Sequence, residues 1–313
     1  MVGSLGEGKT THWSQPGRIA AVLLLALAVL APSCGFKALA AETVVDALGR
    51  SVVPGAATRI MTLGSDVTEI VHALGAGERI IAVDRGSKYP PSVTGKPNVG
   101  YRRQLSVEGL ASLRPDLILA AEDSGPPEAV EVLKSLAIPI VFVPQDNSPQ
   151  GIERKITLIA ASLGLEDKGK AVSAEVLTAF QTAADLAAKI PPERRKKVVF
   201  FHGLVKLSAA GAGTSADAII RYAGGLNPMD IVQGYKAASE EKLVEMAPDV
   251  ILMMSDGKGG PTAEQVFGNR ALAATPAAAN KALVVLDGAY MIGFGPRTSD
   301  AIRDLAKALY PEG

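Results

Sequence analysis

The sequence is poor in the residues that build most reactive sites. The 313-residue chain has one Cys and three His, and 4% of its residues are aromatic. One Cys excludes an internal disulfide framework and Cys-based zinc or iron–sulfur sites. Few aromatic residues argue against a surface that stacks nucleobases. With so few His, a metal ligand has to be sought mainly among oxygen atoms.

The charges of the chain balance. It has 32 Lys and Arg against 32 Asp and Glu, and 48% of its residues are hydrophobic. A nucleic-acid footprint or a polybasic membrane surface needs an excess of basic residues, so neither class of partner is expected. The composition is that of a globular protein, and a chain of this length usually forms more than one folding unit.

The first forty residues have the layout of a secretory signal peptide. Arg18 precedes an apolar run of 13 residues, 19–31, which is too short to span a bilayer. Ala38-Leu39-Ala40 then supplies a small-residue cleavage site. We therefore predict a signal peptide at 1–40, cleaved after Ala40. The alternative is an uncleaved anchor helix.

Cys34 raises a further option, lipid modification. Pro32 lies two residues before it and no Leu lies three before it, so the site is poor for a lipoprotein and we expect Cys34 to be removed with the signal. Removal takes away three bases and one acid from the balanced counts of 32 and 32, which leaves a mature chain of charge −2. It has no Cys, and of the His residues it keeps His72 and His202.

Short β-rich segments alternate with helical ones along the mature chain. Hydrophobic runs predict strands at 60–63, 80–83, 117–120, 140–143 and 198–201, a hairpin at 44–53, and helices at 64–74 and 127–136. Gly64-Ser65-Asp66 offers an N-cap for the first of these helices and Gly75 ends it. Strand–helix–strand alternation predicts mainly parallel sheets.

The segment 150–190 has almost no strand signal and predicts one or two long helices, interrupted at Gly164 and Gly169 and stopped by Pro191-Pro192. On either side, the segments 106–119 and 239–252 repeat each other at an offset of 133 residues. In each, Ser is expected to cap a short helix in a capping arrangement completed by Glu, and Pro-Asp precedes a buried strand. We interpret the repeat as duplicated architecture.

These features predict an α/β protein of two similar lobes with mainly parallel central sheets, joined by a long rigid helix, with a ligand cleft between the lobes. The predicted divisions are a signal peptide at 1–40, an N-terminal lobe at 41–147, a linking region at 148–192 and a C-terminal lobe at 193–313.

Signatures of enzymes are missing from the sequence. It contains no G-x-S-x-G, H-E-x-x-H or G-x-x-x-x-G-K-[ST] motif. Gly211-Ala-Gly213-Thr214 resembles part of a phosphate-binding loop but lacks the Lys, so we interpret it as a helix entry and cap. A serine triad would need His72 or His202, and His72 lies within a helical run, where a structural role is expected. We predict a protein that is not an enzyme.

Tyr101 is the most informative residue for chemistry. It follows Gly100 on a predicted loop and precedes Arg102 and Arg103. Neighbouring guanidinium groups favour a phenolate through opposite charge, and a phenolate suits ferric iron and is a known axial ligand of haem. The two Arg side chains could instead pair with propionates. Residue types and spacing alone also fit a loop Tyr that packs on the surface between solvated Arg side chains.

His202 follows the predicted strand 198–201 and precedes Gly203. In parallel α/β sheets, ligands bind at the carboxyl ends of strands, so His202 is placed where an imidazole could ligate iron or hydrogen-bond a ligand. A His that caps backbone groups at the strand end fits the position equally well.

Several segments together resemble one family. They are Asp46–Arg50, Gly64–Ile70, Val99–Gly109, His202-Gly203, Ala209–Asp217, Ser255–Gly257 and Gly293–Arg297. With them the mature chain resembles the periplasmic haem-binding proteins of bacterial ABC-type haem importers, which belong to a class of two-lobed, helix-linked proteins that also carry siderophores and vitamin B12. The Tyr-x-Arg element before Leu-Ser-x-Glu-Gly is the feature most specific to the haem branch.

The resemblance implies roles for individual residues. It implies that Tyr101 is the axial ligand of the haem iron and that Arg103, with Arg102, supports its phenolate or the propionates. His202 matches a position that some members use as a second ligand or as a contact for a second, stacked haem, so one or two haems are both possible. Members dock on their permease through a charged residue on each lobe; Glu69 matches the first, and the second falls at Arg221, where relatives favour a carboxylate.

The expected function is therefore capture of haem in the periplasm and its delivery to an inner-membrane ABC permease and its ATPase, by a monomer. One alternative is a ferric-siderophore or corrinoid carrier of the same fold, which need not coordinate iron directly. The other, from a different class, is an exported α/β hydrolase, which requires a Ser, a His and an acid within reach of one another.

Overall fold

The structure is a computed structural model that describes residues 42–136, 138–256 and 259–311. The predicted signal peptide, with Cys34 and the cleavage site at Ala40, lies outside the described residues, so export and cleavage stay predictions. Among the described residues, no helix combines the length and apolar character that a membrane crossing requires.

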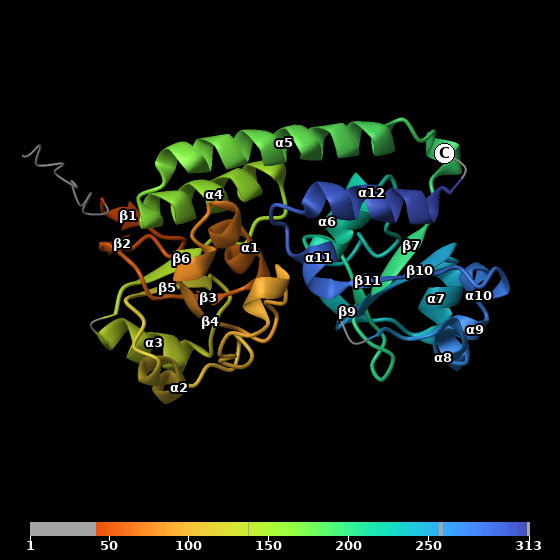
Figure 1. Ribbon diagram of the computed structural model, residues 1–313. Helices are drawn as coiled ribbons and strands as arrows, with labels where there is room; N and C mark the ends of the chain where they lie inside the picture. The colour runs from red at the N-terminus through yellow and green to blue at the C-terminus, as the bar shows by residue number, and fades with distance from the viewer. Residues whose placement is uncertain (1–41, 137, 257–258, 312–313) are drawn as a thin grey trace, which may run out of the picture. The chain divides into compact units, whose positions relative to one another are not determined.

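The first lobe is built on a four-stranded parallel sheet in the order β4-β3-β5-β6 (Figure 1). All residues of β3, β5 and β6 are buried, as expected of a parallel sheet covered on both faces. The strands are β3 (Ile60–Leu63), β4 (Ile80–Val83), β5 (Leu117–Ala121) and β6 (Ile140–Val143), and β1 (Val44–Val45) and β2 (Ser51–Val52) form the hairpin. The helices are α1 (Ser65–Ala73), α2 (Val107–Ser112) and α3 (Pro127–Ser135), with 3₁₀ turns at Gly77–Arg79 and Pro91–Val93. The predicted strands of this lobe are confirmed.

Helix α1 begins differently from the prediction. Gly64 is the N-cap, and no side chain caps the helix. Ser65 is already the first helical residue, and the Asp66 carboxylate is taken up by a buried ion pair with Lys155, whose Nζ lies 2.6 Å from Oδ2. The backbone of Gly64 has φ 136°, a conformation that favours glycine.

Two helices, α4 (Pro149–Leu163) and α5 (Glu166–Ala188), link the lobes. Gly164 adopts the left-handed conformation, with φ 65°, and ends α4. The predicted interruption at Gly169 is wrong. Gly169 lies inside α5, where a Cβ atom would stand 2.5 Å from the Ala160 Cβ, so its missing side chain lets α5 approach α4 closely. Helix α5 packs along α4 at one end and along α12 (Thr298–Leu309) at the other (Figure 1).

The second lobe carries a mixed five-stranded sheet in the order β11-β10-β7-β8-β9. Strands β11, β10 and β7 pair in parallel. At one edge, β8 pairs antiparallel with β7, and β9 pairs antiparallel with β8. The strands are β7 (Val198–Phe201), β8 (Ser208–Ala210), β9 (Tyr235–Ala237), β10 (Val250–Ser255) and β11 (Leu283–Asp287). The helices are α6 (Ser215–Tyr222), α7 (Glu240–Met246), α8 (Ala263–Phe267), α9 (Arg270–Ala273), α10 (Pro276–Ala279), α11 (Gly288–Ile292) and α12, with a 3₁₀ turn at Pro192–Arg194. The predicted boundaries of the lobes stay a prediction.

The internal repeat serves the same purpose in both lobes. Ser106 accepts a hydrogen bond from the Gly109 amide at 3.3 Å, and Ser239 accepts one from the Lys242 amide at 3.2 Å, so each Ser caps its helix. The predicted participation of Glu in the caps is wrong, because Glu108 and Glu241 lie at the second helical position, one residue too early for a capping box.

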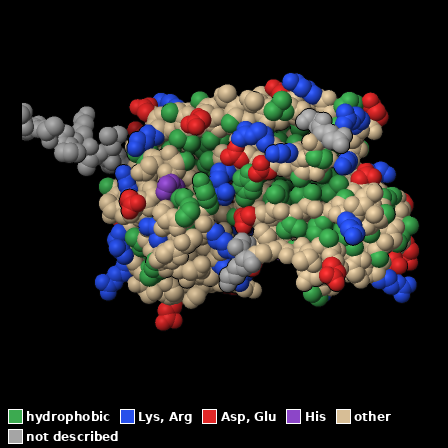
Figure 2. All heavy atoms as spheres, turned by 45° about the vertical axis from the view of Figure 1, so that its right-hand side comes forward, with side chains coloured by type: hydrophobic (Ala, Val, Ile, Leu, Met, Phe, Trp, Pro, Cys, Tyr) green, Lys and Arg blue, Asp and Glu red, His purple; other side chains and the backbone are tan. Residues whose placement is uncertain are grey.

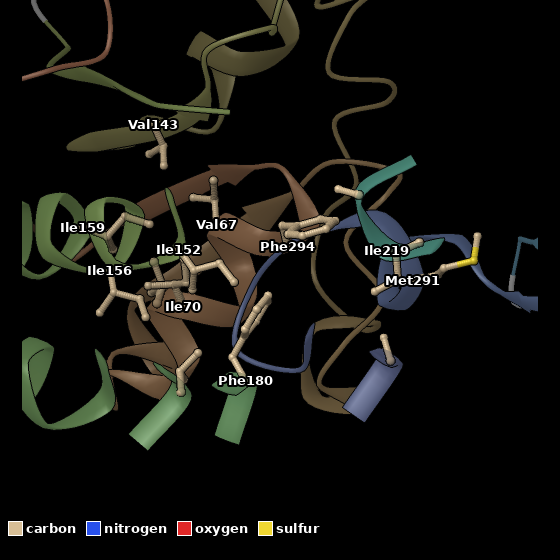
Figure 3. Close-up of a cluster of buried hydrophobic side chains, with 14 of the residues drawn as sticks. Val67, Ile70, Val143, Ile152, Ile156, Ile159, Phe180, Ile219, Met291 and Phe294 are labelled. Carbon is tan, nitrogen blue, oxygen red and sulfur yellow. The ribbon is translucent and has the colours of Figure 1, made fainter. Parts of the chain in front are cut away.

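One hydrophobic cluster extends through both lobes (Figure 3). Ile70 of α1 and Ile156 of α4 pack in the same cluster as Phe180 of α5 and Ile219 of α6. Met291 and Phe294, which are 0% and 1% exposed, belong to this core. Because this buried apolar surface is shared, separating the lobes would expose it to water, which favours small relative movements of the lobes.

Candidate functional site

A cleft of about 1300 Å³ lies between the lobes. Many of its lining residues lie on loops that follow the carboxyl ends of strands, the usual ligand position in parallel α/β sheets. The first lobe contributes residues after β4, β5 and β6, and the second contributes residues after β7 and β10. Tyr101, Arg102, Arg103 and His202 all line this cleft, so the structure brings together the residues that the sequence singled out for ligand binding.

Tyr101 is half-buried on the first-lobe wall, with guanidinium groups on two sides. Arg103 Nη1 donates a hydrogen bond of 2.8 Å to the phenol oxygen. Arg85 Cζ lies 5.0 Å from the centroid of the Tyr101 ring, in cation–π range. Tyr101 is thus contacted by two guanidinium groups, one at its oxygen and one at its ring.

Asp123 holds both neighbouring arginines in place. It accepts hydrogen bonds of 2.9 and 2.8 Å from Arg102 Nε and Nη2, one of 3.0 Å from Arg103 Nε, and one from Arg103 Nη2. Burial tends to raise the pKa of the Asp123 carboxyl, but the hydrogen bonds and charges of the two arginines outweigh it and the pKa is lowered. Burial likewise opposes the charge of Arg103, yet Tyr101 and Asp123 raise the pKa of its guanidinium.

The two arginines therefore differ in what they contact. Arg103 bridges the Tyr101 phenol and Asp123, whereas Arg102 forms a bidentate ion pair with Asp123. Asp123 lies on the turn after β5 and was not identified from the sequence. Its signal was faint, because an acidic residue on a turn after a strand is common and its partners lie about twenty positions earlier in the chain.

His202 lies on the opposite wall, exposed at the end of β7. Its ring stands edge-on to that of Tyr235, with 6.3 Å between ring centroids. Burial raises the pKa of the Tyr235 phenol. Tyr235 also lines the cleft and was missed, because the short edge strand β9 that carries it has no hydrophobic pattern.

Among the residues that the structure describes, neither histidine has the hydrogen-bond partners of a serine triad. Within the described part of the chain, no hydrogen bond joins His202 to a Ser hydroxyl or to a carboxylate, whereas a serine triad needs both. His72 is exposed on α1, where Nε2 lies 3.4 Å from the Ser92 hydroxyl. Of the described residues, no three His, Cys, Asp or Glu side chains form a group that could hold a metal ion.

The glycine-rich segment has the structural role that was expected of it. Thr214 caps α6 by accepting a hydrogen bond of 3.1 Å from the Asp217 amide. A Cβ atom on Gly211 would lie 2.2 Å from the Val232 carbonyl oxygen, so this glycine permits close packing of backbone on backbone.

The two predicted docking residues have very different surroundings. Glu69 is 7% exposed and pairs with Arg297, which donates hydrogen bonds of 2.9 and 2.6 Å to its two carboxylate oxygens. Burial raises the pKa of the Glu69 carboxyl, and Arg297 opposes that rise. Arg221 is on the surface of α6, with Nη2 3.0 Å from Asp217 Oδ2. Glu69 is thus committed to a contact inside the protein.

Basic and acidic side chains are interspersed over the face shown in Figure 2, in keeping with the balanced charge of the chain.

The lobes are also connected at the cleft, where the Ser215 hydroxyl donates a hydrogen bond of 2.9 Å to the Asn147 side chain.

A two-lobed α/β architecture with a cleft between lobes and paired linking helices defines a substrate-binding protein. The family model for periplasmic binding proteins matches residues 60–290, and the chain belongs to this family. This membership confirms the predicted fold class. Members of the family are transport proteins that bind the substrate to be transported. That this chain catalyses no reaction stays a prediction.

The chain is also similar to individual solved structures and curated proteins. The chain is similar to the apo form of the periplasmic haem-binding protein RhuT from Roseiflexus sp. RS-1, with 35% identity, 81% of this chain and 98% of that one covered, and a TM-score of 0.76. It is similar to the periplasmic haem-binding protein BhuT in complex with two haems, with 34% identity, the same coverage and a TM-score of 0.75.

Among curated proteins, the substrate-binding lipoprotein YvrC of Bacillus subtilis is 25% identical over 257 residues, which are 81% of this chain and 80% of that one. The vitamin B12-binding protein of Yersinia pseudotuberculosis is 26% identical over 199 residues, which are 63% of this chain and 70% of that one.

Proposed function

We propose that this protein binds haem in the cleft between its lobes and delivers it to an inner-membrane ABC permease and its ATPase. The observation that carries the proposal is the Tyr101 phenol, which faces the cleft with Arg103 hydrogen-bonded to its oxygen at 2.8 Å. The similarity to RhuT and BhuT, both named as haem-binding proteins, supports it.

In this proposal the Tyr101 phenolate is the ligand of the ferric iron. Arg103 stabilises its negative charge through the hydrogen bond to the oxygen, and Asp123 fixes Arg103 in the orientation that this bond needs. A single bond from the protein to iron, in a cleft open to solvent, gives affinity while leaving the ligand accessible to a transporter.

We propose further that the cleft takes two haems, with His202 on the wall opposite Tyr101 serving the second. The cleft volume of about 1300 Å³ exceeds the roughly 300–1,000 Å³ typical of sites for one small molecule. The BhuT structure contains two haems in a chain of comparable length and similar fold.

A corrinoid carrier is the second candidate, favoured by the likeness to vitamin B12-binding proteins. Titrations with haemin, cyanocobalamin and a ferric siderophore, each followed by absorption spectroscopy, separate the candidates. We expect a shifted Soret band with haemin that saturates at two equivalents, and no binding of the other two. Saturation at one equivalent would contradict the two-haem proposal alone. Binding of cobalamin without any haemin shift would overturn the function itself.

For location, we propose export to the periplasm with cleavage after Ala40. The relative YvrC is named a lipoprotein, which makes Cys34 the residue to test. The test is the intact mass of the mature protein, measured for the wild type and for a Cys34→Ala variant. The same mass in both, equal to that of a chain beginning at residue 41, supports cleavage after Ala40. A wild-type mass that includes a lipid, and a variant mass that does not, contradicts it.

For docking, a permease needs exposed charge on both lobes. The sequence predicts Glu69 and Arg221 for this role, but Glu69 is 7% exposed and paired with Arg297. The internal repeat supplies another pair: Glu108 and Glu241 occupy the same position in α2 and α7, one on each lobe, and both are exposed. We propose that this pair docks on the permease.

A further inference from the structure

Five basic side chains line the cleft: Arg85, Lys88, Arg102, Arg103 and Lys206. Two of them are already engaged, because Arg102 and Arg103 share the carboxylate of Asp123. The ion pairs between described residues include none of the other three, and all three are exposed. The cleft thus presents positive charge that is not balanced by an ion pair within the described chain.

The acidic groups of the cleft are directed elsewhere. Asp84 is 1% exposed and accepts hydrogen bonds from the Gly64 amide at 3.1 Å, the Gly86 amide at 3.0 Å and the Ser87 hydroxyl at 2.6 Å. Asp287 caps α11 by accepting a hydrogen bond of 3.0 Å from the Tyr290 amide. Asp256, which also lines the cleft, has its own contact and forms no ion pair with Arg85 or Lys206.

Two of these three cations, none of which forms an ion pair with a described residue, stand next to the proposed iron ligands. The Arg85 amide donates a hydrogen bond of 2.7 Å to the Gly100 carbonyl, which ties its loop to the Tyr101 loop, and its guanidinium lies 5.0 Å from the Tyr101 ring centroid. Lys206 belongs to the β7–β8 loop that begins with His202, beside Val205, which is 99% exposed. Each wall of the cleft therefore combines an iron-binding residue type with a free cation.

We infer that Arg85 on the first lobe and Lys206 on the second bind the carboxylates at the rim of the macrocycle, and that Arg102 and Arg103 do not. The inference rests on the proposed function and assigns its carboxylate contacts. An Arg or Lys that meets a carboxylate directly forms a charge-assisted hydrogen bond, about twice as strong as a neutral one. Arg102 and Arg103 already form such bonds with the Asp123 carboxylate.

The test compares haemin with haemin dimethyl ester, which has the same ring and iron but no carboxylates. The variants are Arg85→Gln, Lys206→Gln and their combination, with Lys170→Gln, a 79% exposed Lys side chain on α5, as the matched control. The measurement is the rate at which loaded protein gives up its ligand to apomyoglobin. We expect each cleft variant to lose haemin about tenfold faster, equivalent to roughly 1.4 kcal/mol, and the double variant faster still.

The ester and a spectrum make the outcome decisive. We expect the phenolate charge-transfer band to persist in every variant, because Tyr101 and its hydrogen bond from Arg103 are intact. Loss of the ester should be unchanged in Lys206→Gln. In Arg85→Gln it should accelerate less than loss of haemin, since Arg85 also lies against the Tyr101 ring. Arg85→Lys should restore part of the retention of haemin. Haemin loss at the wild-type rate, or equal acceleration with the ester, would overturn the assignment while leaving the proposed function standing. Failure of the wild-type protein to bind haemin would instead overturn both.

Discussion

Arg297 and Glu69 face each other from different lobes and are joined by hydrogen bonds of 2.9 Å from Nε and 2.6 Å from Nη2. The Arg297 guanidinium also lies 3.7 Å from the ring centroid of Tyr89 and 4.9 Å from that of Tyr290. These contacts fix one side chain of the second lobe against α1 of the first. The pair holds the lobes together away from the residues proposed to bind ligand.

Replacing Arg297 by Ala should destabilise the protein strongly. The substitution leaves the buried Glu69 carboxylate without its partner, and breaking a buried ion pair costs about 3 kcal/mol or more. Arg303 lies nearby in the sequence and forms an exposed ion pair with Asp300. Arg303→Ala should therefore lower the free energy of unfolding by less than about 1 kcal/mol. Urea unfolding measures both.

A second variant tests the reason for this loss. Burial raises the pKa of the Glu69 carboxyl, so the neutral Glu69→Gln side chain should be tolerated better when Arg297 is missing. We expect Arg297→Ala to cost less in the Glu69→Gln background than in the wild type. An equal cost in both backgrounds would show that lost packing on the Tyr rings, and not the unpaired carboxylate, causes the destabilisation.

Asp123 should make stability depend on acid pH. The arginines hold the pKa of its carboxyl below the ordinary 3.8, although burial opposes them. A lowered folded-state pKa gives stability that is present above the unfolded value and is lost as pH falls through the folded value. Asp123→Asn should therefore cost about 1–2 kcal/mol at neutral pH, and the gap to wild type should narrow as the pH falls below 3.8. Urea midpoints across this range measure the gap, and a constant gap would contradict the account.

Docking is tested in vesicles that contain the cognate permease and ATPase. The double variant Glu108→Ala/Glu241→Ala should lose most stimulation of ATP hydrolysis and keep its affinity for haemin, because both side chains are exposed and neither lines the cleft. Arg221→Ala alone serves as the comparison. Full stimulation by the double variant, together with loss in Arg221→Ala, would return the docking role to the pair predicted from the sequence.

Much of the fold follows from local pattern. The strands 60–63, 80–83, 140–143 and 198–201 were predicted with their observed bounds, because buried parallel strands are short apolar runs between turn residues. Strands β8 and β9 were not predicted. They have three residues each, no residue of β9 is buried, and antiparallel pairing at a sheet edge leaves little trace in composition.

The site was predictable where neighbours in sequence are neighbours in space. Arg103 lies two positions from Tyr101, and the expected contact between them is present. Long-range partners were not predictable: Asp123 meets the arginines from the turn after β5, and Arg297 meets Glu69 across 228 positions. The docking role of Glu69 was inferred from position alone, and burial by the second lobe is a tertiary effect that one helix pattern does not reveal.

The role of Tyr101 is tested most directly by the absorption spectrum of the haemin complex. Wild type and Tyr101→Phe are loaded with ferric haemin, with Tyr222→Phe, a Tyr outside the cleft, as the control. A phenolate–iron bond should give wild type and Tyr222→Phe a charge-transfer band that Tyr101→Phe lacks, with faster loss of haemin from Tyr101→Phe. The same band and the same retention in Tyr101→Phe would show that another group ligates the iron and would contradict the account.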